Sequence, residues 1–98
     1  MLERLIDLLD LPDADYWADV GSGEARALID ESPTIVLFEV GRQWQSWPVN
    51  RQEHLAYVLG ESSLSIEKEI LLEMVESGNS SVAMSAREAL RSIPGSDA

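Results

Sequence analysis

The sequence predicts an all-α domain built from stacked helix pairs, and three observations support this fold class. Apolar residues recur at helical spacing through most of the chain. Residue types that cap the start of a helix recur with a period of 31 residues. Only the segment TIVLFEV, residues 34–40, is as rich in β-branched residues as a strand, and a single strand would have no partner to pair with.

The period divides the chain into three units, residues 1–31, 32–62 and 63–93. In this alignment one column holds the leucines Leu28, Leu59 and Leu90. Another column holds the capping residues Asp19, Asn50 and Ser81. Each unit is therefore predicted to form a helix, a short loop and a second helix within one domain, residues 1–93, and residues 94–98 are predicted to be a flexible tail.

The first unit begins with an amphipathic segment, MLERLIDLLDL, in which three acidic residues interrupt the apolar ones. This pattern predicts a helix and argues against a signal peptide, and no run approaches the roughly 20 apolar residues of a membrane span. Pro12 ends this helix, and Gly21 and Gly23 weaken a second helix that begins near Val20.

The second unit begins with Ser32 as the predicted N-cap and Pro33 at the first helical position, where a missing N–H is tolerated. Residues 34–40 are predicted to form a helix that is buried on most of its faces. Asn50 and Glu53 resemble a capping box at the start of the next helix.

The third unit has the clearest helical periodicity. The apolar stripe of its first helix comprises Ile66, Ile70, Leu71, Met74 and Val75. The stripe of its second helix comprises Val82, Ala86, Ala89, Leu90 and Ile93. Gly78 and Asn79 form the turn between the two helices.

This third unit resembles a short HEAT-like repeat of the bacterial kind. In that family a Leu-Leu-x-Leu-Leu helix and a polar turn precede Val-Arg-x-x-Ala-Ala-x-Ala-Leu, and LLEMVESGNSSVAMSAREAL, residues 71–90, follows this pattern except at Ala83 and Arg87. The middle unit has Arg51 in place of the valine. The resemblance extends over nearly the whole chain and implies a short right-handed α-solenoid or helical bundle, in which stacking covers the apolar face of each helix pair.

The chain is strongly acidic, with a net charge of −11, and residues 1–31 account for −7 of it. Such a charge repels nucleic acid and anionic membranes and attracts a basic protein partner, although it also serves plain solubility. There is no cysteine, which excludes disulfides and fits a cytoplasmic location. At 98 residues the chain has room for one modest core.

No residue pattern in the sequence predicts catalysis, a cofactor or a metal site. His54 is the only histidine, and neither a nucleophile nor an orienting group stands at a helical spacing from it, so it is predicted to be a surface or partly packed residue. The cluster DLPDADYWAD, residues 10–19, has carboxylates, but Trp17 occupies the third ligand position of a calcium loop.

The acidic cluster and the aromatic residues form the predicted partner-binding site. The electric field would come from Asp13, Asp15, Asp19 and Glu24. The anchoring rings would be Tyr16, Trp17, Trp44 and Trp47. Large rings also fill gaps between helices, so the pattern leaves open whether Trp17 and Trp44 belong to the core or to an interface.

These features favour a non-enzymatic inhibitor that binds a protein. In size, charge and lack of catalytic motifs the chain loosely resembles small acidic bacterial immunity proteins. This resemblance implies a cytoplasmic protein that neutralises a basic toxin domain, such as a nuclease, by occluding its active site or substrate surface. The alternative is a generic HEAT-like interaction module or an assembly subunit of a larger complex.

Overall fold

The structure is a computed structural model that describes residues 2–59 and 65–92, and this part of the chain forms six helical segments without a strand. In chain order the elements are α1 (Glu3–Leu9), α2 (Ala14–Tyr16), the π-helix η1 (Trp17–Gly21), α3 (Ser22–Glu31), α4 (Pro33–Gln43), the 3-10 helix η2 (Trp44–Ser46), α5 (Val49–Leu59), α6 (Ser65–Val75) and α7 (Ser80–Ser92). Because α2, η1 and α3 join into one continuous helix and η2 extends α4, these elements make six separate helical segments. The all-α prediction is confirmed, whereas the predicted tail, residues 94–98, lies outside the described residues.

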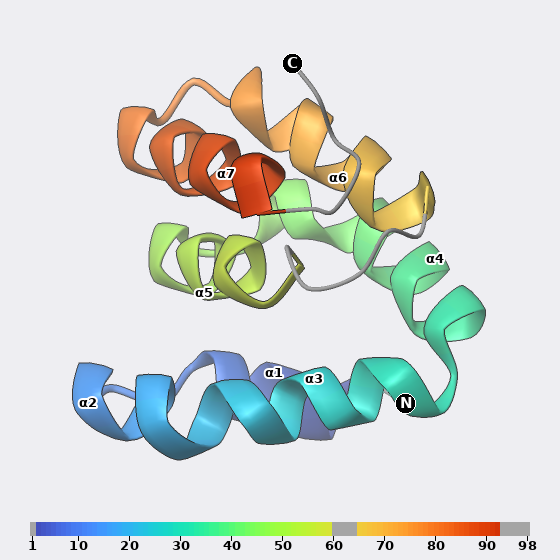
Figure 1. Cartoon of the computed structure of the whole chain (residues 1–98), viewed down its shortest axis with the longest axis vertical. Coiled ribbons are helices and arrows are strands. Elements are labelled where there is room, and N and C mark those ends of the chain that lie inside the picture. Colours follow the sequence, from blue (N-terminus) through green and yellow to red (C-terminus); the bar gives the residue numbers. More distant parts are fainter. Residues whose placement is uncertain (1, 60–64, 93–98) are drawn as a thin grey trace.

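The helices are stacked in layers, and α5 is the central one (Figure 1). One side of α5 packs against α1 and α3, and the other side packs against α6 and α7. Helix α4 lies at the edge of the stack and contacts both α3 and α6. The central position explains why α5 has four fully buried apolar side chains, Leu55, Ala56, Val58 and Leu59.

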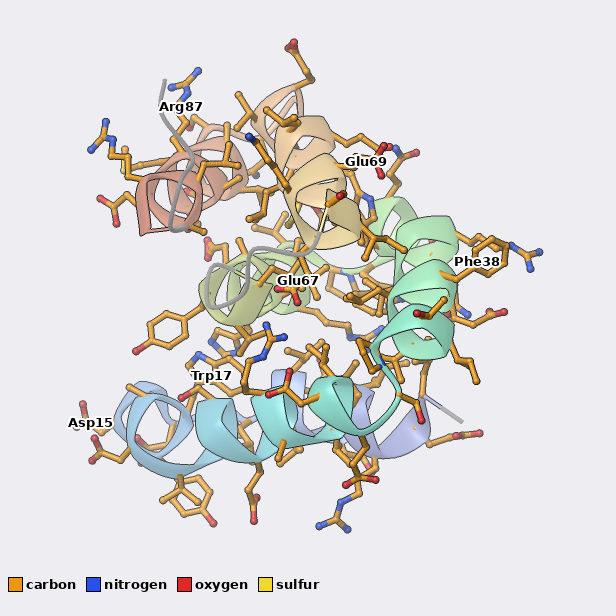
Figure 2. The ribbon with its side chains drawn as sticks, turned by 45° about the vertical axis from the view of Figure 1, so that its right-hand side comes forward. Asp15, Trp17, Phe38, Glu67, Glu69 and Arg87 are labelled. Atoms are coloured by element: carbon orange, nitrogen blue, oxygen red, sulfur yellow. The ribbon has the colours of Figure 1, made fainter. Side chains whose placement is uncertain are left out.

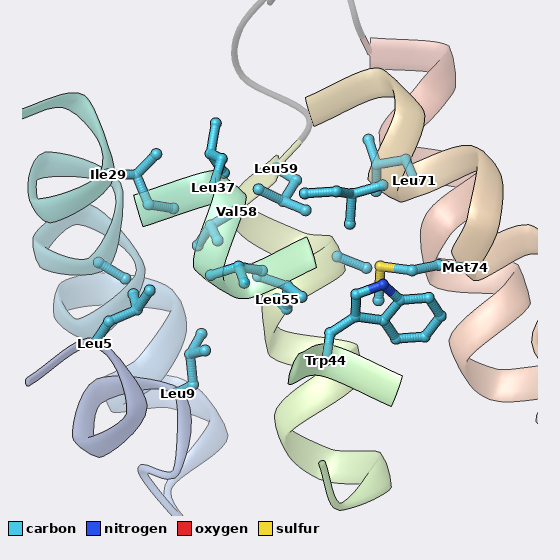
Figure 3. Packing of buried hydrophobic residues seen from close by; sticks show 14 of the residues in the cluster. Leu5, Leu9, Ile29, Leu37, Trp44, Leu55, Val58, Leu59, Leu71 and Met74 are labelled. Atoms are coloured by element: carbon cyan, nitrogen blue, oxygen red, sulfur yellow. The ribbon is translucent and has the colours of Figure 1, made fainter. Parts of the chain in front are cut away.

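The buried apolar side chains form one continuous core that runs through all the layers (Figure 3). The stripes predicted for the third unit face this core in the described residues, since Leu71, Met74, Val82 and Ala86 are completely buried, whereas Ile93 lies outside the described residues. The three leucines of the aligned column differ, however. Leu59 is completely buried, whereas Leu28 and Leu90 are only partly buried at the margin of the core.

The predicted helix start at Ser32 is right, and the starts predicted from the aligned capping column are wrong. Helix α4 begins at Pro33 after Ser32, as predicted. Asp19, Asn50 and Ser81 are instead inside helices. In α7 the cap is Asn79, whose Oδ1 accepts from the backbone N–H groups of Ser81 at 3.0 Å and Val82 at 3.1 Å. The side chain that precedes the first turn can reach its unpaired N–H groups, and Ser81 already belongs to that turn.

Residues 34–40 are helical as predicted, within α4, but they are not buried on most of their faces. Val36, Leu37 and Val40 face the core, whereas Ile35 is 52% exposed and Phe38 is 59% exposed. The difference arises because α4 lies at the edge of the stack, where only one side of a helix meets the other layers. An apolar outer face is therefore left on α4.

A buried ion pair joins the first layer to the last. The guanidinium of Arg26 on α3 donates to both carboxylate oxygens of Glu67 on α6, at 2.7 and 2.6 Å, and Glu67 is completely buried (Figure 2). Arg26 also donates to the Val58 carbonyl at 3.0 Å and to Asp30 at 2.7 Å. The hydrogen bonds that Arg26 donates to Glu67 are the main cause that raises the pKa of Arg26 above its usual value, so the guanidinium stays charged.

Candidate protein-binding surface

The exposed side of the continuous helix formed by α2, η1 and α3 is the strongest candidate for a binding surface. We call it the acidic helix face and define it by six exposed residues: Asp15, Tyr16, Asp19, Gly23, Glu24 and Glu31. Four of these six side chains are carboxylates on a single helix. The surface therefore carries a dense negative charge on a rigid element.

The π-helical segment η1 is what brings these carboxylates to one side. In an uninterrupted α-helix Asp15 and Glu24 would lie on nearly opposite faces, because each residue turns the helix by about 100°. Here the N–H of Ser22 donates to the carbonyl of Trp17, five residues earlier, so the turn holds one additional residue. The additional residue shows in the burial pattern, because the neighbours Gly21 and Ser22 are both buried. The side chains after Ser22 therefore point in directions shifted by one residue from those of an uninterrupted α-helix.

The π segment has local support that explains its position. The hydroxyl of Ser22 donates to the carbonyl of Ala18 at 3.0 Å, which gives this oxygen a partner where the helical pattern changes. Gly21 faces inward, and an added Cβ there would lie 2.6 Å from Leu11 Cδ1 and 3.0 Å from the Trp17 ring. Internal packing therefore requires the absence of a side chain at Gly21.

Gly23 differs from Gly21, because no internal contact requires it. An added Cβ at Gly23 would meet nothing within 4 Å. A glycine inside a helix costs about 1 kcal/mol relative to alanine, so it is normally kept for a reason. On an exposed face a glycine lets another molecule approach the backbone closely. The sequence shows both glycines, but within the sequence they indicate only a weak helix and do not distinguish the packed Gly21 from the exposed Gly23.

Asp13 has a structural task as well as a charge. Its Oδ1 accepts from the backbone N–H of Asp15 at 2.9 Å and from that of Tyr16 at 3.2 Å, so it caps the continuous helix. Asp13 therefore starts the helix on which the acidic helix face lies. Of the four predicted acids, Asp15, Asp19 and Glu24 are left exposed on the helix itself.

Among the predicted anchors only Tyr16 is on the surface, where it is 50% exposed. Trp17 is 3% exposed, and its ring stacks on His54 with the centroids 4.4 Å apart and the planes at 12°. The open question about Trp17 is therefore answered in favour of the core. Its ring supports the acidic helix face from behind and does not present an anchor to a partner.

Trp44 and Trp47 are also core residues, with exposures of 3% and 7%. Trp44 packs with the buried side chains of the last layer (Figure 3). Trp47 lies under the guanidinium of Arg51, which is 5.3 Å from its ring centroid. This placement answers the open question about Trp44 in favour of the core and corrects the prediction that Trp47 is an anchoring ring on the surface, because the segment between α4 and α5 packs inward against the core.

His54 is partly packed, as predicted, and it links helices. Its Nδ1 lies 2.6 Å from the carbonyl oxygen of Leu9 at the end of α1, so Nδ1 carries the proton because a carbonyl can only accept. One turn away, Arg51 makes two hydrogen bonds to Asp10, at 2.9 and 2.8 Å. These contacts fasten α5 to the end of α1, a structural role that the sequence did not reveal.

In residues 2–59 and 65–92 there is no group of three or more His, Cys, Asp or Glu residues that could hold a metal ion. None of the helices in these ranges is long and apolar enough to cross a membrane. No protein-family model matches the chain, and comparisons with curated proteins and with solved structures gave no significant match.

Proposed function

We propose that the chain is a non-enzymatic inhibitor that binds a basic protein through the acidic helix face, and that this partner is a bacterial toxin domain. The observation that carries the proposal is the set of four exposed carboxylates, Asp15, Asp19, Glu24 and Glu31, on one side of a single helix. Gly23, which internal packing does not require, lies among them and supports close approach of a partner.

The charges act mainly on the encounter between the two proteins. A net charge of −11 and a concentrated acidic surface raise the association rate with a basic partner, and salt reduces this gain. If the toxin is a nuclease, the carboxylates occupy the basic surface that otherwise holds the phosphates of its substrate. Tyr16 supplies the exposed ring that is buried on binding, in place of the tryptophans.

The second candidate is an interaction module or an assembly subunit of a larger complex. The observation that favours it is the apolar outer face of α4, where Ile35 and Phe38 are more than half exposed. An inhibitor that acts only through its charged helix has no need of this second surface.

The test is affinity capture from cells that contain the candidate toxin, followed by mass spectrometry. The bait is either the wild-type chain or the double variant Asp15→Lys/Asp19→Lys. A matched double variant, Asp7→Lys/Glu76→Lys, makes the same change of net charge at exposed positions outside the acidic helix face. We expect a basic protein to be captured by the wild type and by the matched variant, and much less of it by the acidic-face variant.

Two results would count against the proposal. One is a captured protein with an acidic surface. The other is equal loss of capture with both double variants, since this would mean that only net charge matters. An activity assay of the purified toxin, with and without an excess of the chain, then separates an inhibitor from an assembly subunit, because only an inhibitor abolishes the activity.

A further inference from the structure

A second surface, on the other side of the molecule, has a different character. A hollow of about 440 Å³ lies between α4 and α6. We call it the α4–α6 groove and define it by its apolar lining, Leu37, Phe38, Gly41, Ile66, Ile70 and Leu72. Leu37 and Ile70 form a buried floor, whereas Phe38 and Leu72 are 59% and 50% exposed. Exposed apolar residues that gather around a hollow indicate a contact surface.

Gly41 leaves space at this groove for the close approach of another backbone. It lies within α4, and an added Cβ would meet only the Ile70 side chain, at an ordinary contact distance of 3.8 Å. Alanine would therefore fit and would favour the helix by about 1 kcal/mol. The internal packing does not explain why the floor of the groove has no side chain here, and close packing of a second chain does.

The charges around the groove indicate the sign of its occupant. Two carboxylates, those of Glu69 and Glu73, line it together with one guanidinium, that of Arg42. Arg42 is already engaged, because it lies 3.7 Å from Glu39 and its guanidinium is 5.9 Å from the centre of the Phe38 ring. Glu69 and Glu73 are exposed on α6 and leave the rim negative.

The groove is separate from the acidic helix face. Figure 2 shows Phe38 and Glu69 on one side of the molecule and Asp15 on the opposite side. A partner that covers one surface therefore leaves the other accessible. An occupant of the groove goes beyond the inhibitor function proposed above.

We propose that the α4–α6 groove binds an amphipathic helix of another protein, with apolar side chains at i, i+3 and i+4 and with lysine or arginine beside them. A hollow between two helices fits the ridge of a third helix. The apolar side chains enter between Phe38 and Leu72, the backbone passes close to Gly41, and the basic side chains pair with Glu69 and Glu73. A second copy of the chain is a poor occupant, since it would bring a protein of net charge −11 against another.

The test uses two labelled peptides of about 14 residues, the length of a helix slightly longer than the 11 residues of α4 or α6. Both peptides contain only leucine, alanine, lysine and arginine, and the two have the same composition. In one the leucines fall on a single helical face, and in the other they are distributed around the helix. We expect fluorescence anisotropy to show at least about tenfold tighter binding of the first peptide, because both carry the same charge and only one fits the groove.

Variants then locate the binding site. Phe38→Ser and Leu72→Ser should each weaken binding of the amphipathic peptide by about tenfold. Met84→Ser is the matched control, because Met84 is 61% exposed on α7 outside the groove and its loss should leave binding unchanged. Glu69→Lys/Glu73→Lys should weaken binding more than Asp15→Lys/Asp19→Lys, although both double variants change the net charge equally.

Gly41→Ala keeps the test decisive even if an apolar variant unfolds. It should raise the melting temperature and yet weaken binding of the peptide, a combination that loss of folding cannot produce. Equal binding of the two peptides, or equal effects of the groove variants and their controls, would overturn the proposal. So would self-association in sedimentation that Phe38→Ser abolishes, since the occupant would then be a second copy. The groove variants lie outside the acidic helix face, and Asp15→Lys/Asp19→Lys serves here only as a control, so failure here leaves the inhibitor proposal standing.

Discussion

The acidic helix face and the α4–α6 groove differ in shape, chemistry and origin. The first is a convex row of carboxylates on one helix, and its residues lie within 16 positions of one another in the sequence, from Asp15 to Glu31. The second is a hollow that exists only because α4 and α6 pack side by side. The comparison teaches that a charged surface can be located from one helix once the direction of its side chains is known. An apolar groove can be located only when the packing of two helices is known.

The physical consequences of the two surfaces also differ. Exposed charges act over about 10 Å, and salt screens them, so the acidic helix face should govern how fast a partner arrives. Apolar contacts act only when water has been excluded, so the groove should govern how long a partner stays. If the two surfaces belong to one folded unit, changes in the core between them should lower stability. If the glycines and acids of the acidic helix face serve binding, their replacement should change partner binding.

The largest effect is expected from breaking the ion pair that joins the helices of the two surfaces. Glu67→Gln removes the buried charge partner of Arg26 and leaves only the exposed carboxylate of Asp30, so it should lower the free energy of unfolding by about 3 kcal/mol. Urea denaturation followed by tryptophan fluorescence measures it. Glu39→Gln, which removes an exposed carboxylate 3.7 Å from Arg42, is the control and should change stability by less than about 0.5 kcal/mol. Equal effects of both changes would contradict the role of the buried pair.

The second effect tests whether aligned leucines in the middle and last units are equivalent. Leu59→Ala opens a cavity in the core beside the central helix α5 and should lower the free energy of unfolding by about 2–5 kcal/mol. Leu90→Ala, at the margin of the core, should cost only about 1–2 kcal/mol, because solvent can fill the space that it leaves. Equal and large losses in thermal denaturation would show that the two leucines are equivalent.

The third effect compares the two glycines of the continuous helix. Gly21→Ala places a methyl group against Leu11 and the Trp17 ring and should destabilise the fold by about 1–3 kcal/mol. Gly23→Ala meets nothing and should stabilise it by about 0.5–1 kcal/mol while weakening partner binding. Calorimetry gives the two signs. A neutral effect of Gly23→Ala on binding would remove this glycine from the acidic helix face.

The smallest effect separates the acid that starts the helix from an acid that faces solvent. Asp13→Ala removes the cap and should cost about 1 kcal/mol of stability. Asp15→Ala should change stability by less than about 0.5 kcal/mol and should instead slow association with the partner. Stopped-flow association rates and thermal melts on the same samples give both quantities. Equal stability losses would mean that Asp15 shares the capping task.

The sequence by itself determined most of the secondary structure. Helical spacing identified the core stripes of α6 and α7, and Ser32 with Pro33 marked the start of α4. It also identified the acidic cluster, three of whose residues lie exposed on one helix. These features are local, because they depend on neighbours within about one helical turn.

Only the tertiary structure decided which side of each helix meets solvent. The π segment rotates Glu24 toward Asp15, since one additional residue in a turn changes the direction of every side chain beyond it. The tryptophans lie in the core because other helices pack around them. Arg26 pairs across the stack with Glu67, which is 41 residues away in the sequence. The edge position of α4 left Phe38 exposed. Packing between distant segments sets burial and pairing, and no pattern within a single helix contains that information.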